Sequence, residues 1–325
     1  MENMIKKIAI LTSGGDAPGM NPAIRAVVKD ALAKNIEPFL VYEGYKGLHE
    51  GKIESAKNIN VDKYINRGGT FIFSARYPAF KDPAVRQEAK EQLDKLGIDA
   101  LVVIGGDGSY HGAQLLHEMG VKTIALPGTI DNDITSSDFT IGYDTALNTI
   151  IENIDRIRDT MESHSRAAIV EVMGHGCGDL ALYSGLATGA EVIVTNECKI
   201  SPEEIGRIVK EQTEKGKNSI IVIVSEHIYE NIHDVAKIVE KISGKGTRGM
   251  ALEHLQRGGI PTAAERINSA RMGMKAVELI SEGKSGLAIG IIKGATVATP
   301  ILEALKIPRT DRTEKTKKFN KLNQA

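Results

Sequence analysis

The sequence predicts an α/β fold of mostly parallel β-sheets that are covered by helices on both faces. Short apolar runs rich in β-branched residues alternate with stretches of helical periodicity along most of the chain. This alternation is typical of strand–helix–strand units. The runs are continuously hydrophobic, as in sheets that are buried on both faces. At 325 residues the chain is long enough for two domains or for one large α/β unit.

The apolar runs and the periodic stretches give the expected elements in order. The expected strands are residues 7–12, 38–43, 100–106, 121–128, 167–174, 191–196, 219–227 and 287–292. The clearest helical periodicity lies in Pro83–Leu96, Tyr143–Met161, Ser201–Lys215 and Ala263–Ile280. The Lys-rich tail from Lys306 to Lys321 shows no apolar periodicity, so we expect a solvated terminus there. Parallel sheets bind ligands beyond the carboxyl ends of their strands, and the loops after these runs are therefore where functional residues are expected.

Composition excludes several classes of function. A formal net charge of -1 gives no electrostatic basis for binding nucleic acid or an anionic membrane. The N-terminal apolar run is too short for a signal peptide or a membrane span. Cys177 and Cys198 are the only cysteines, too few for a disulfide framework and without the spacing of a zinc site. We therefore expect a cytoplasmic protein without a nucleic-acid or membrane partner.

Glycine is concentrated in loops at the ends of the expected strands. Gly-Gly pairs stand at residues 14–15, 68–69, 105–106 and 258–259. One such pair most often marks a turn. Several pairs at strand ends indicate backbone that lies close to a ligand, and bare N–H groups near a helix N-terminus suit phosphate.

The segment GGDGSY, residues 105–110, combines such a glycine turn with an acidic residue. Ser109 is expected as a helix N-cap, so that several N–H groups point at one spot. A carboxylate and phosphates repel each other unless a cation lies between them, and Asp107 is therefore interpreted as a Mg²⁺ anchor beside a polyphosphate. Alternatively, Asp107 caps its own turn. The Walker A motif does not match, because Glu278 stands where its leading glycine belongs before GKS at 283–285.

The segment PGTIDND, residues 127–133, places two carboxylates in a further loop. Asp and Asn form turns readily, so a purely structural explanation also exists. In an extended segment, however, Asp131 and Asp133 project to the same side. One of them then faces a metal and the other accepts a proton from an attacking hydroxyl, and phosphoryl transfer needs little else from a protein beyond positioning and cations. Gly128 and Thr129 fit a loop that admits a phosphate and donates a hydroxyl to it.

Four arginines lie in or beside these loop segments. They are Arg76, Arg166, Arg248 and Arg257. Each is by itself most often a surface residue, but together their planar guanidinium groups suit a phosphorylated acceptor such as a sugar phosphate.

Taken together, the segments closely resemble the bacterial ATP-dependent 6-phosphofructokinases, which phosphorylate fructose 6-phosphate at its 1-hydroxyl in glycolysis. The resemblance runs from about Lys6 to Ile292 and depends on the order of LTSGGDAPGMN, GGDGSY, PGTIDND, IGYDTALN and QRGGIPTAAER. GGDG alone also fits NAD kinases and diacylglycerol-kinase-like proteins. The resemblance implies two Rossmann-like domains, with residues 1–142 plus 256–306 binding ATP and residues 143–255 plus 307–325 binding fructose 6-phosphate.

The resemblance also implies roles for individual residues. Asp131 corresponds to the general base, with Thr129, Arg76 and His175 as further catalytic residues. Asp107 and Asp133 correspond to partners of Mg²⁺. The ATP contacts correspond to Gly15, Arg76, Tyr77, Gly106, Asp107, Gly108 and Ser109. The fructose 6-phosphate contacts correspond to Thr129, Ile130, Asp131, Met173, Gly174, His175, Glu226, His254, Leu255, Gln256 and Arg257 and, from a neighbouring subunit of a homotetramer, to Arg166 and Arg248.

Two glycines indicate the phosphoryl donor. Pyrophosphate-dependent relatives carry Asp after GGD and Lys before the threonine of TIDND, where this chain has Gly108 and Gly128. An Asp side chain at position 108 would crowd and repel the α-phosphate of a nucleotide. ATP is therefore the expected donor.

Some positions depart from the family pattern. His175 replaces the arginine of the family's MGR and cannot form a bidentate fork. Glu253 stands where the relatives usually have Gly. In the family, ADP and phosphoenolpyruvate compete for a basic pocket between subunits, yet Asn58 and Asn218 replace two of its cations, so we expect weak or altered allostery. The matching pocket residues are Arg25, Lys29, Arg158, Gly189, Glu191, Lys215, Lys217 and Ser219.

Two other functions remain open at this point. A kinase of similar build could act on another sugar phosphate such as tagatose 6-phosphate, because sequence does not fix the stereochemistry of a hydroxyl. A non-catalytic nucleotide or sugar-phosphate sensor could keep the fold, but it would not need Asp107, Asp131 and Asp133 together. A plain α/β scaffold with turn-forming Gly and Asp does not explain the order of the motifs.

Overall fold

The computed structural model describes residues 5–325 and divides into two compact α/β units. Unit 1 consists of Met1–Ile130, Ile134–Thr145 and Arg257–Pro308. Unit 2 consists of Asp131–Asp133, Ala146–Gln256 and Arg309–Ala325. The predicted fold class of mostly parallel sheets covered by helices is confirmed, and each expected apolar run contains a strand.

Unit 1 is built on an eight-stranded sheet with the order β12-β11-β5-β4-β1-β2-β3, in which β6 pairs with β5 beside this path. The central strands are parallel, whereas β3 and β12 pair antiparallel at the two edges. Burial of β4 along its whole length explains its continuous hydrophobicity. The strands are β1 (Lys7–Ser13), β2 (Glu37–Val41), β3 (Ile53–Ser55), β4 (Ala100–Gly105), β5 (Lys122–Thr129), β6 (Ile141–Gly142), β11 (Leu287–Ile292) and β12 (Ala295–Pro300).

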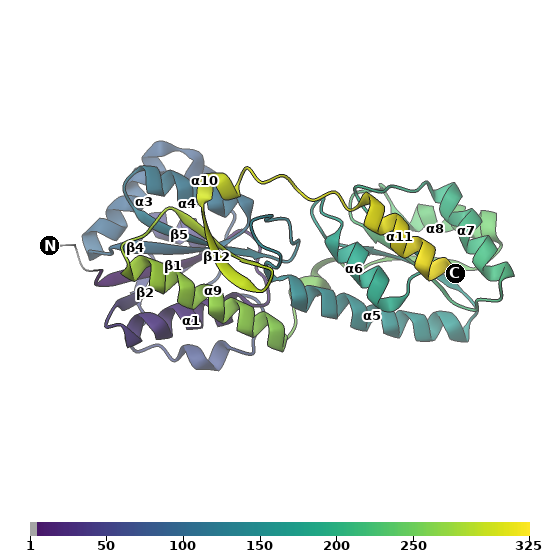
Figure 1. Ribbon diagram of the computed structural model, residues 1–325, viewed down its shortest axis with the longest axis horizontal. Coiled ribbons are helices and arrows are strands. Elements are labelled where there is room, and N and C mark those ends of the chain that lie inside the picture. The colour runs from purple at the N-terminus through teal and green to yellow at the C-terminus, as the bar shows by residue number, and fades with distance from the viewer. Residues whose placement is uncertain (1–4) are drawn as a thin grey trace. The chain divides into compact units, whose positions relative to one another are not determined.

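Helices cover both faces of this sheet, with α3 and α4 on one side and α1 and α9 on the other (Figure 1). Local signals define their ends. Helix α3 begins after Asp82, whose side chain accepts a hydrogen bond from the Ala84 N–H at 2.9 Å, and it ends at Gly97 with φ +64°. The helices are α1 (Met20–Ala33), α2 (Gly44–His49), α3 (Pro83–Leu96), α4 (Asp107–Glu118), α9 (Ala263–Ser281) and α10 (Ile301–Ala304), with 3₁₀ turns η1 (Val61–Tyr64) and η2 (Pro78–Lys81).

Unit 2 is built on a four-stranded parallel sheet with the order β10-β7-β9-β8. Helices α7 and α8 pack their apolar faces against one side of it, and α6 packs against Ile193, which points to the other side. The strands are β7 (Ala167–Val172), β8 (Val192–Val194), β9 (Ile220–Ser225) and β10 (Thr247–Ala251). The helices are α5 (Tyr143–Ser163), α6 (Asp179–Thr188), α7 (Pro202–Glu214), α8 (Ile232–Ser243) and α11 (Thr313–Gln324), with η3 (Glu253–Arg257). The first three residues of α5 and the last residue of η3 belong to unit 1.

The C-terminal tail is not the solvated terminus that its composition predicts. Helix α11 buries Thr316 and Asn320. The Asn320 side chain accepts a hydrogen bond from the Ile193 N–H at 2.7 Å and donates one to the Ile193 carbonyl at 2.9 Å. The inner face of α11 therefore docks through polar side chains on the edge of β8, which explains the missing apolar periodicity.

No helix within residues 5–325 combines the length and the apolar character that a membrane span requires.

Glu265 is a buried carboxyl group in unit 1. It lies in the first turn of α9, where Thr262 Oγ1 accepts a hydrogen bond from the Glu265 N–H at 3.1 Å. Its own oxygens accept hydrogen bonds from the N–H groups of Gly142 at 2.8 Å and Thr145 at 3.3 Å. Burial is the main cause that raises the pKa of Glu265 to about 7. This carboxyl joins α9 to the start of α5.

We expect Glu265 to make stability fall as pH rises. Because its folded pKa of about 7 exceeds the ordinary value of 4.5, the stabilisation is complete below about pH 4.5 and is lost as pH rises through 7. Between pH 5 and pH 8, the free energy of unfolding of the wild type relative to Glu265→Gln should fall by on the order of 3 kcal/mol. Urea unfolding at both pH values measures this difference. Parallel pH dependence in the two proteins would contradict it.

Candidate active site

The carboxyl ends of β1 and β4 are fixed against each other in unit 1. Ser109 Oγ donates a hydrogen bond to the Ser13 carbonyl at 3.1 Å, and Tyr45 donates one to the Ser109 carbonyl at 2.6 Å. A β-carbon at Gly105 would lie 2.3 Å from Ser109 Oγ and 2.5 Å from the Ser13 carbonyl oxygen. Only glycine therefore allows the two loops to approach this closely.

Helix α4 presents its N-terminus at this edge of the sheet. The helix begins at Asp107, and its N-cap residue is Gly106, so the expectation of Ser109 as N-cap is wrong. The glycine turn starts the helix earlier, which leaves Ser109 buried in the first turn. Gly106 has no side chain that could cap the N–H groups of this end, a property that suits a phosphate. Beside it, the Asp107 side chain is 62% exposed, and a β-carbon at Gly108 would meet no atom within 4 Å.

The segment that contains Arg76 lies against the loop after β1. The Gly14 N–H donates to the Ala75 carbonyl at 3.5 Å, and Ser74 Oγ donates to the Gly14 carbonyl at 2.8 Å. Arg76 itself is exposed, and Tyr77 is half-buried. The structure thus brings these two predicted ATP contacts to the same loops as Gly15.

Arg257 also lies in unit 1, beside the loop after β1. Its Nη1 is 2.7 Å from the position of a β-carbon at Gly15 and 3.9 Å from Asp16 Oδ1. The neighbouring predicted sugar contacts His254, Leu255 and Gln256 belong to unit 2. The structure therefore groups Arg257 with the predicted ATP residues rather than with its neighbours in the chain.

The loop after β5 carries the predicted base. Thr129 ends the strand, and its carbonyl accepts a hydrogen bond from Thr140 Oγ1 at 2.6 Å. Asn132 has φ +53°, a left-handed conformation that Asn tolerates better than most residues. The expectation that Asp131 and Asp133 share one side of an extended segment is therefore wrong, because the segment is not extended between them. Ile130 is buried.

In unit 2, the turn Met173–His175 follows β7 and is shaped by side chains from two neighbouring segments. Glu226 Oε1 accepts hydrogen bonds from the Gly174 N–H at 3.1 Å and the His175 N–H at 2.8 Å. The buried Gln256 accepts one from the Met173 N–H at 3.0 Å. The turn leaves the His175 side chain exposed. The structure thus brings together the predicted sugar contacts at 173–175, 226 and 256.

Three carboxylates lie near this turn. Burial is the main cause that raises the pKa of Glu171, and the charges of Glu226 and Glu253 raise it further. Glu253 has φ +42°, a left-handed conformation that costs a residue other than Gly about 1–2 kcal/mol. A glycine at this position would adopt it without strain. His254 and Leu255, which follow, are exposed.

Arg166 and Arg248 do not join the other predicted sugar contacts within the chain. Arg166 immediately precedes β7, whereas Met173 immediately follows it. Arg248 lies at the amino end of β10, and η3 follows the carboxyl end. At about 3.3 Å per residue, the strand separates Arg166 from Met173 by roughly 20 Å. These two arginines therefore lie at the amino ends of the strands, whereas the Met173–His175 turn lies at their carboxyl ends.

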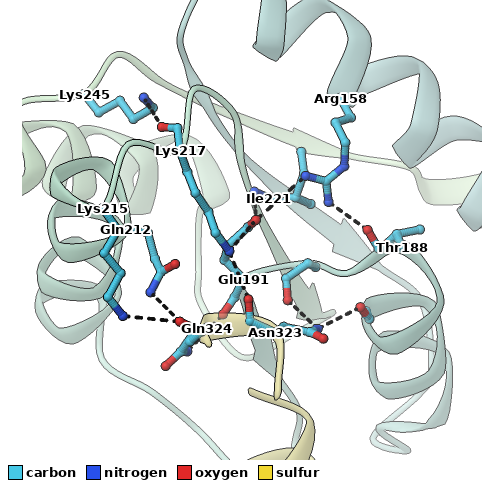
Figure 2. A network of polar contacts seen from close by, with 12 residues as sticks. Arg158, Thr188, Glu191, Gln212, Lys215, Lys217, Ile221, Lys245, Asn323 and Gln324 are labelled. Carbon is cyan, nitrogen blue, oxygen red and sulfur yellow. Dashed lines mark hydrogen bonds and ion pairs between the residues drawn. The ribbon is translucent and has the colours of Figure 1, made fainter. Parts of the chain in front are cut away.

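Most of the predicted effector residues of unit 2 form one polar network (Figure 2). The buried Glu191 accepts hydrogen bonds from Lys217 Nζ at 3.3 Å and from the Ile221 N–H at 2.8 Å. Lys217 and Lys215 also donate to the carbonyls of Asn323 at 3.0 Å and Gln324 at 3.3 Å. The end of the chain thus engages both lysines, a role that no sequence motif indicated.

Arg158 belongs to the same network through an ion pair with Glu191 at 3.9 Å, and the remaining effector residues make other contacts. Arg158 donates to the Thr188 carbonyl at 2.8 Å, next to Gly189 (Figure 2). Hydrogen bonds from Ser219 and then Asn218 lower the pKa of Glu162. In unit 1, Arg25 and Lys29 both pair with Asp62, at 2.6 and 2.9 Å.

The chain is similar to known phosphofructokinases along most of its length. Residues 7–280 match the family model described as Phosphofructokinase. An ATP-dependent 6-phosphofructokinase of Mycoplasmopsis pulmonis is 62% identical over 308 residues, which cover 94% of each chain. An ATP-dependent 6-phosphofructokinase of Spiroplasma citri is 55% identical over 321 residues, which cover 99% of this chain and 98% of the relative.

Solved structures show the same fold. Phosphofructokinase from Saccharomyces cerevisiae matches with a TM-score of 0.87 and 35% identity over 98% of this chain, which spans 47% of the yeast chain. A pyrophosphate-dependent phosphofructokinase from Marinobacter aquaeolei matches with a TM-score of 0.83 at 21% identity, which shows the fold alone. On the family match and the high identity over nearly its whole length, this chain belongs to the phosphofructokinase family.

Proposed function

We propose that the chain transfers the γ-phosphoryl group of ATP to the 1-hydroxyl of fructose 6-phosphate. The observation that carries this proposal is the path of the chain through residues 129–133. Thr129 lies in unit 1. Its β-carbon is 4.0 Å from the point that a β-carbon at Gly106, the N-cap residue of α4, would occupy. Two residues later, Asp131 belongs to unit 2, where Asn132 contacts Cys177 just beyond the Met173–His175 turn. The loop thus links the proposed nucleotide residues to the proposed sugar residues.

Each group then has a distinct task in the reaction. The N–H groups of the α4 N-terminus bind phosphate oxygens of the nucleotide, and Arg76 adds a guanidinium to them. The turn at Met173–His175, shaped by Glu226 and Gln256, binds the sugar. Asp131 accepts the proton of the attacking hydroxyl, while Thr129 contacts the transferred group. Catalysis is then positioning plus electrostatic stabilisation.

The donor set is suited to Mg²⁺ held jointly with the nucleotide. Within residues 5–325, no group of three or more His, Cys, Asp and Glu side chains could hold a metal ion alone. The exposed carboxylate of Asp107, beside the N-terminus of α4, would be a hard oxygen ligand for the ion, and the phosphates of the nucleotide would supply further oxygens. Asp133 already accepts a hydrogen bond from Arg309 at 2.9 Å, so it would act through water. When bound, the ion neutralises charge on the transferred phosphoryl group.

ATP as donor is supported by the space around Gly108. A β-carbon at this position would meet no protein atom within 4 Å. Because glycine has no side chain, this space stays open for a ligand. Gly128 carries no such weight, because a β-carbon there would lie 2.9 Å from Ile104 Cγ2 and 3.0 Å from the Gly105 nitrogen. A side chain at position 128 would crowd these neighbours, so local packing also favours glycine there whatever the donor.

We further propose that the active enzyme is a homotetramer with shared sites. Arg166 and Arg248 lie at the amino ends of their strands, whereas the sugar turn lies at the carboxyl end. Within one chain they are too far away to bind the same sugar phosphate. A neighbouring subunit would supply these guanidinium groups for the 6-phosphate.

Replacing the base should abolish most of the turnover. Asp131→Asn keeps the shape of the side chain but removes the proton acceptor, and kcat should fall by roughly 10²–10⁴-fold. A coupled assay of ADP release with fructose 6-phosphate, Mg²⁺ and ATP measures this effect. Asp155→Asn, on the exposed surface of α5, is the control. An unchanged kcat of Asp131→Asn would rule out Asp131 as the base. Separately, a wild-type protein that uses only pyrophosphate would contradict ATP as the donor.

A carboxylate at position 108 should weaken nucleotide binding without unfolding the protein. Gly108→Asp has room in the structure but places a negative charge near the phosphates, so we expect the KM for ATP to rise by about tenfold or more. Gly108→Asn, which has the same size and no charge, is the matched control and should change it far less. Equal effects of the two variants would show that crowding, not charge, excludes the nucleotide.

A further inference from the structure

Two arginines of the C-terminal segment are linked to the loop that carries the proposed base, one by a direct contact and the other through a carboxylate. They are Arg309 and Arg312, named here the C-terminal arginine pair, and unit 2 includes both them and residues 131–133. No motif pointed to either of them. Arg309 contacts Asp133, and Arg312 is linked through Asp179 to Asn132, so both lead to the residues that follow Asp131 in the loop.

Arg312 reaches Asn132 through a buried carboxylate. Its Nε and Nη2 donate to the two oxygens of Asp179 at 2.5 and 3.0 Å, a bidentate pair in which Asp179 is almost fully buried. Asp179 Oδ2 in turn accepts a hydrogen bond from Asn132 Nδ2 at 2.9 Å. Asn132 is the residue with φ +53°, so this chain of contacts holds the loop at its left-handed position.

Arg309 contacts the next loop residue and the turn after β7. Its Nη2 donates to Asp133 Oδ2 at 2.9 Å, and its Nη1 donates to the His175 carbonyl at 3.3 Å. A β-carbon at Gly176 would lie 3.2 Å from the same Nη1. One planar guanidinium therefore joins the loop after β5 to the turn proposed to bind the sugar.

The first turn of helix α11 fixes the backbone of Arg312. The Arg312 carbonyl accepts hydrogen bonds from the Thr316 N–H at 2.8 Å and from Thr316 Oγ1 at 2.9 Å, and Thr316 is fully buried. Asn320, one turn further, is bonded to β8. Arg312, the N-cap residue of α11, is thus anchored, and Arg309 lies three residues before it in the segment that leads into the helix.

We propose that Arg309 is a positioning residue for phosphoryl transfer, which holds the loop carrying Asp131 in a fixed relation to the His175 turn, with Arg312 supporting the same loop through Asp179. This inference rests on the proposed function. The exposed fractions agree with such a role: the Asp133 side chain is 8% exposed and that of Arg309 is 49% exposed. The carboxylate is withdrawn from water and directed by the arginine. A surface ion pair with two mobile partners would expose both.

Kinetics of Arg309→Ala test the inference directly. A displacement of the loop by about 1 Å can cost roughly 10²-fold in rate, so we expect kcat to fall by about that factor. KM for ATP should stay within about threefold, because the nucleotide residues lie elsewhere in the chain. Arg309→Lys should restore only part of the loss, since one ammonium on a flexible stem cannot reproduce the planar fork.

The matched control is Arg207→Ala. Arg207 is an exposed arginine of α7 that pairs with Glu204, and it lies outside the proposed site. Its kcat should equal that of the wild type. If Arg309→Ala also keeps wild-type kcat, or if Arg309→Lys is as impaired as Arg309→Ala, the positioning role is wrong.

A double-mutant cycle with Asp133 separates positioning from a general loss of stability. If Arg309 acts through Asp133, Arg309→Ala should lower kcat far less in the Asp133→Asn background than it does in the wild type. Fully additive losses would overturn the inference. Asn132→Gly, which keeps the left-handed backbone but removes the amide, should lower kcat in the same way as Arg309→Ala. Wild-type kcat in that variant would contradict the supporting role of Arg312.

Failure of this inference is distinguishable from failure of the proposed function. A wild-type protein that does not phosphorylate fructose 6-phosphate contradicts the function itself, whatever the variants do. A wild type that is fully active beside an equally active Arg309→Ala contradicts the positioning role alone. Calorimetric titration of fructose 6-phosphate into Arg309→Ala adds a measurement without turnover. Binding should remain within about threefold of the wild type if the loss is in the transfer step.

Discussion

The loop from Thr129 to Asp133 has to leave one unit and enter the other, and the rest of the proposed site depends on how it is held. Its first residue is fixed by the hydrogen bond between Thr140 and the Thr129 carbonyl. Its last residues are fixed by Asp179 and Arg309, which belong to unit 2. Between these anchors Asn132 adopts a left-handed conformation. The orientation of Asp131 therefore depends on the contacts of the residues before it and after it in the loop.

The sequence predicts much of this molecule where a local physical rule applies. Continuous apolar runs predict the buried parallel strands, and glycine pairs predict the loops at their carboxyl ends. The same rules fail where contacts distant in sequence decide. The sequence predicts Ser109 as a helix cap, but α4 begins at Asp107 with Gly106 as its N-cap, and the Ser109 hydroxyl bonds to the distant Ser13 carbonyl instead. Helix α11 lacks apolar periodicity because its buried face is polar, with Asn320 bonded to β8.

The structure shows the surroundings of His175 and Glu253, the two residues that depart from the expected family pattern in the proposed sugar site. His175 cannot supply a guanidinium, but its carbonyl oxygen accepts a hydrogen bond from Arg309 Nη1 at 3.3 Å, so a cation remains at this turn. Glu253 keeps a backbone conformation that suits glycine and adds a negative charge near Glu171. Neither effect could be predicted from the sequence, because φ at one residue and the reach of an arginine from the chain's end both depend on the folded structure.

The central claim is that one chain holds the base and the sugar turn at the carboxyl ends of its strands, whereas Arg166 and Arg248 serve a neighbouring subunit. Co-expression of Asp131→Ala with the double variant Arg166→Ala/Arg248→Ala tests it most directly. Each protein alone should be nearly inactive. Mixed oligomers should regain up to about a quarter of wild-type kcat, the share of sites in a random one-to-one mixture that pair an intact base with intact arginines. Activity no greater than the mean of the two parents would contradict shared sites.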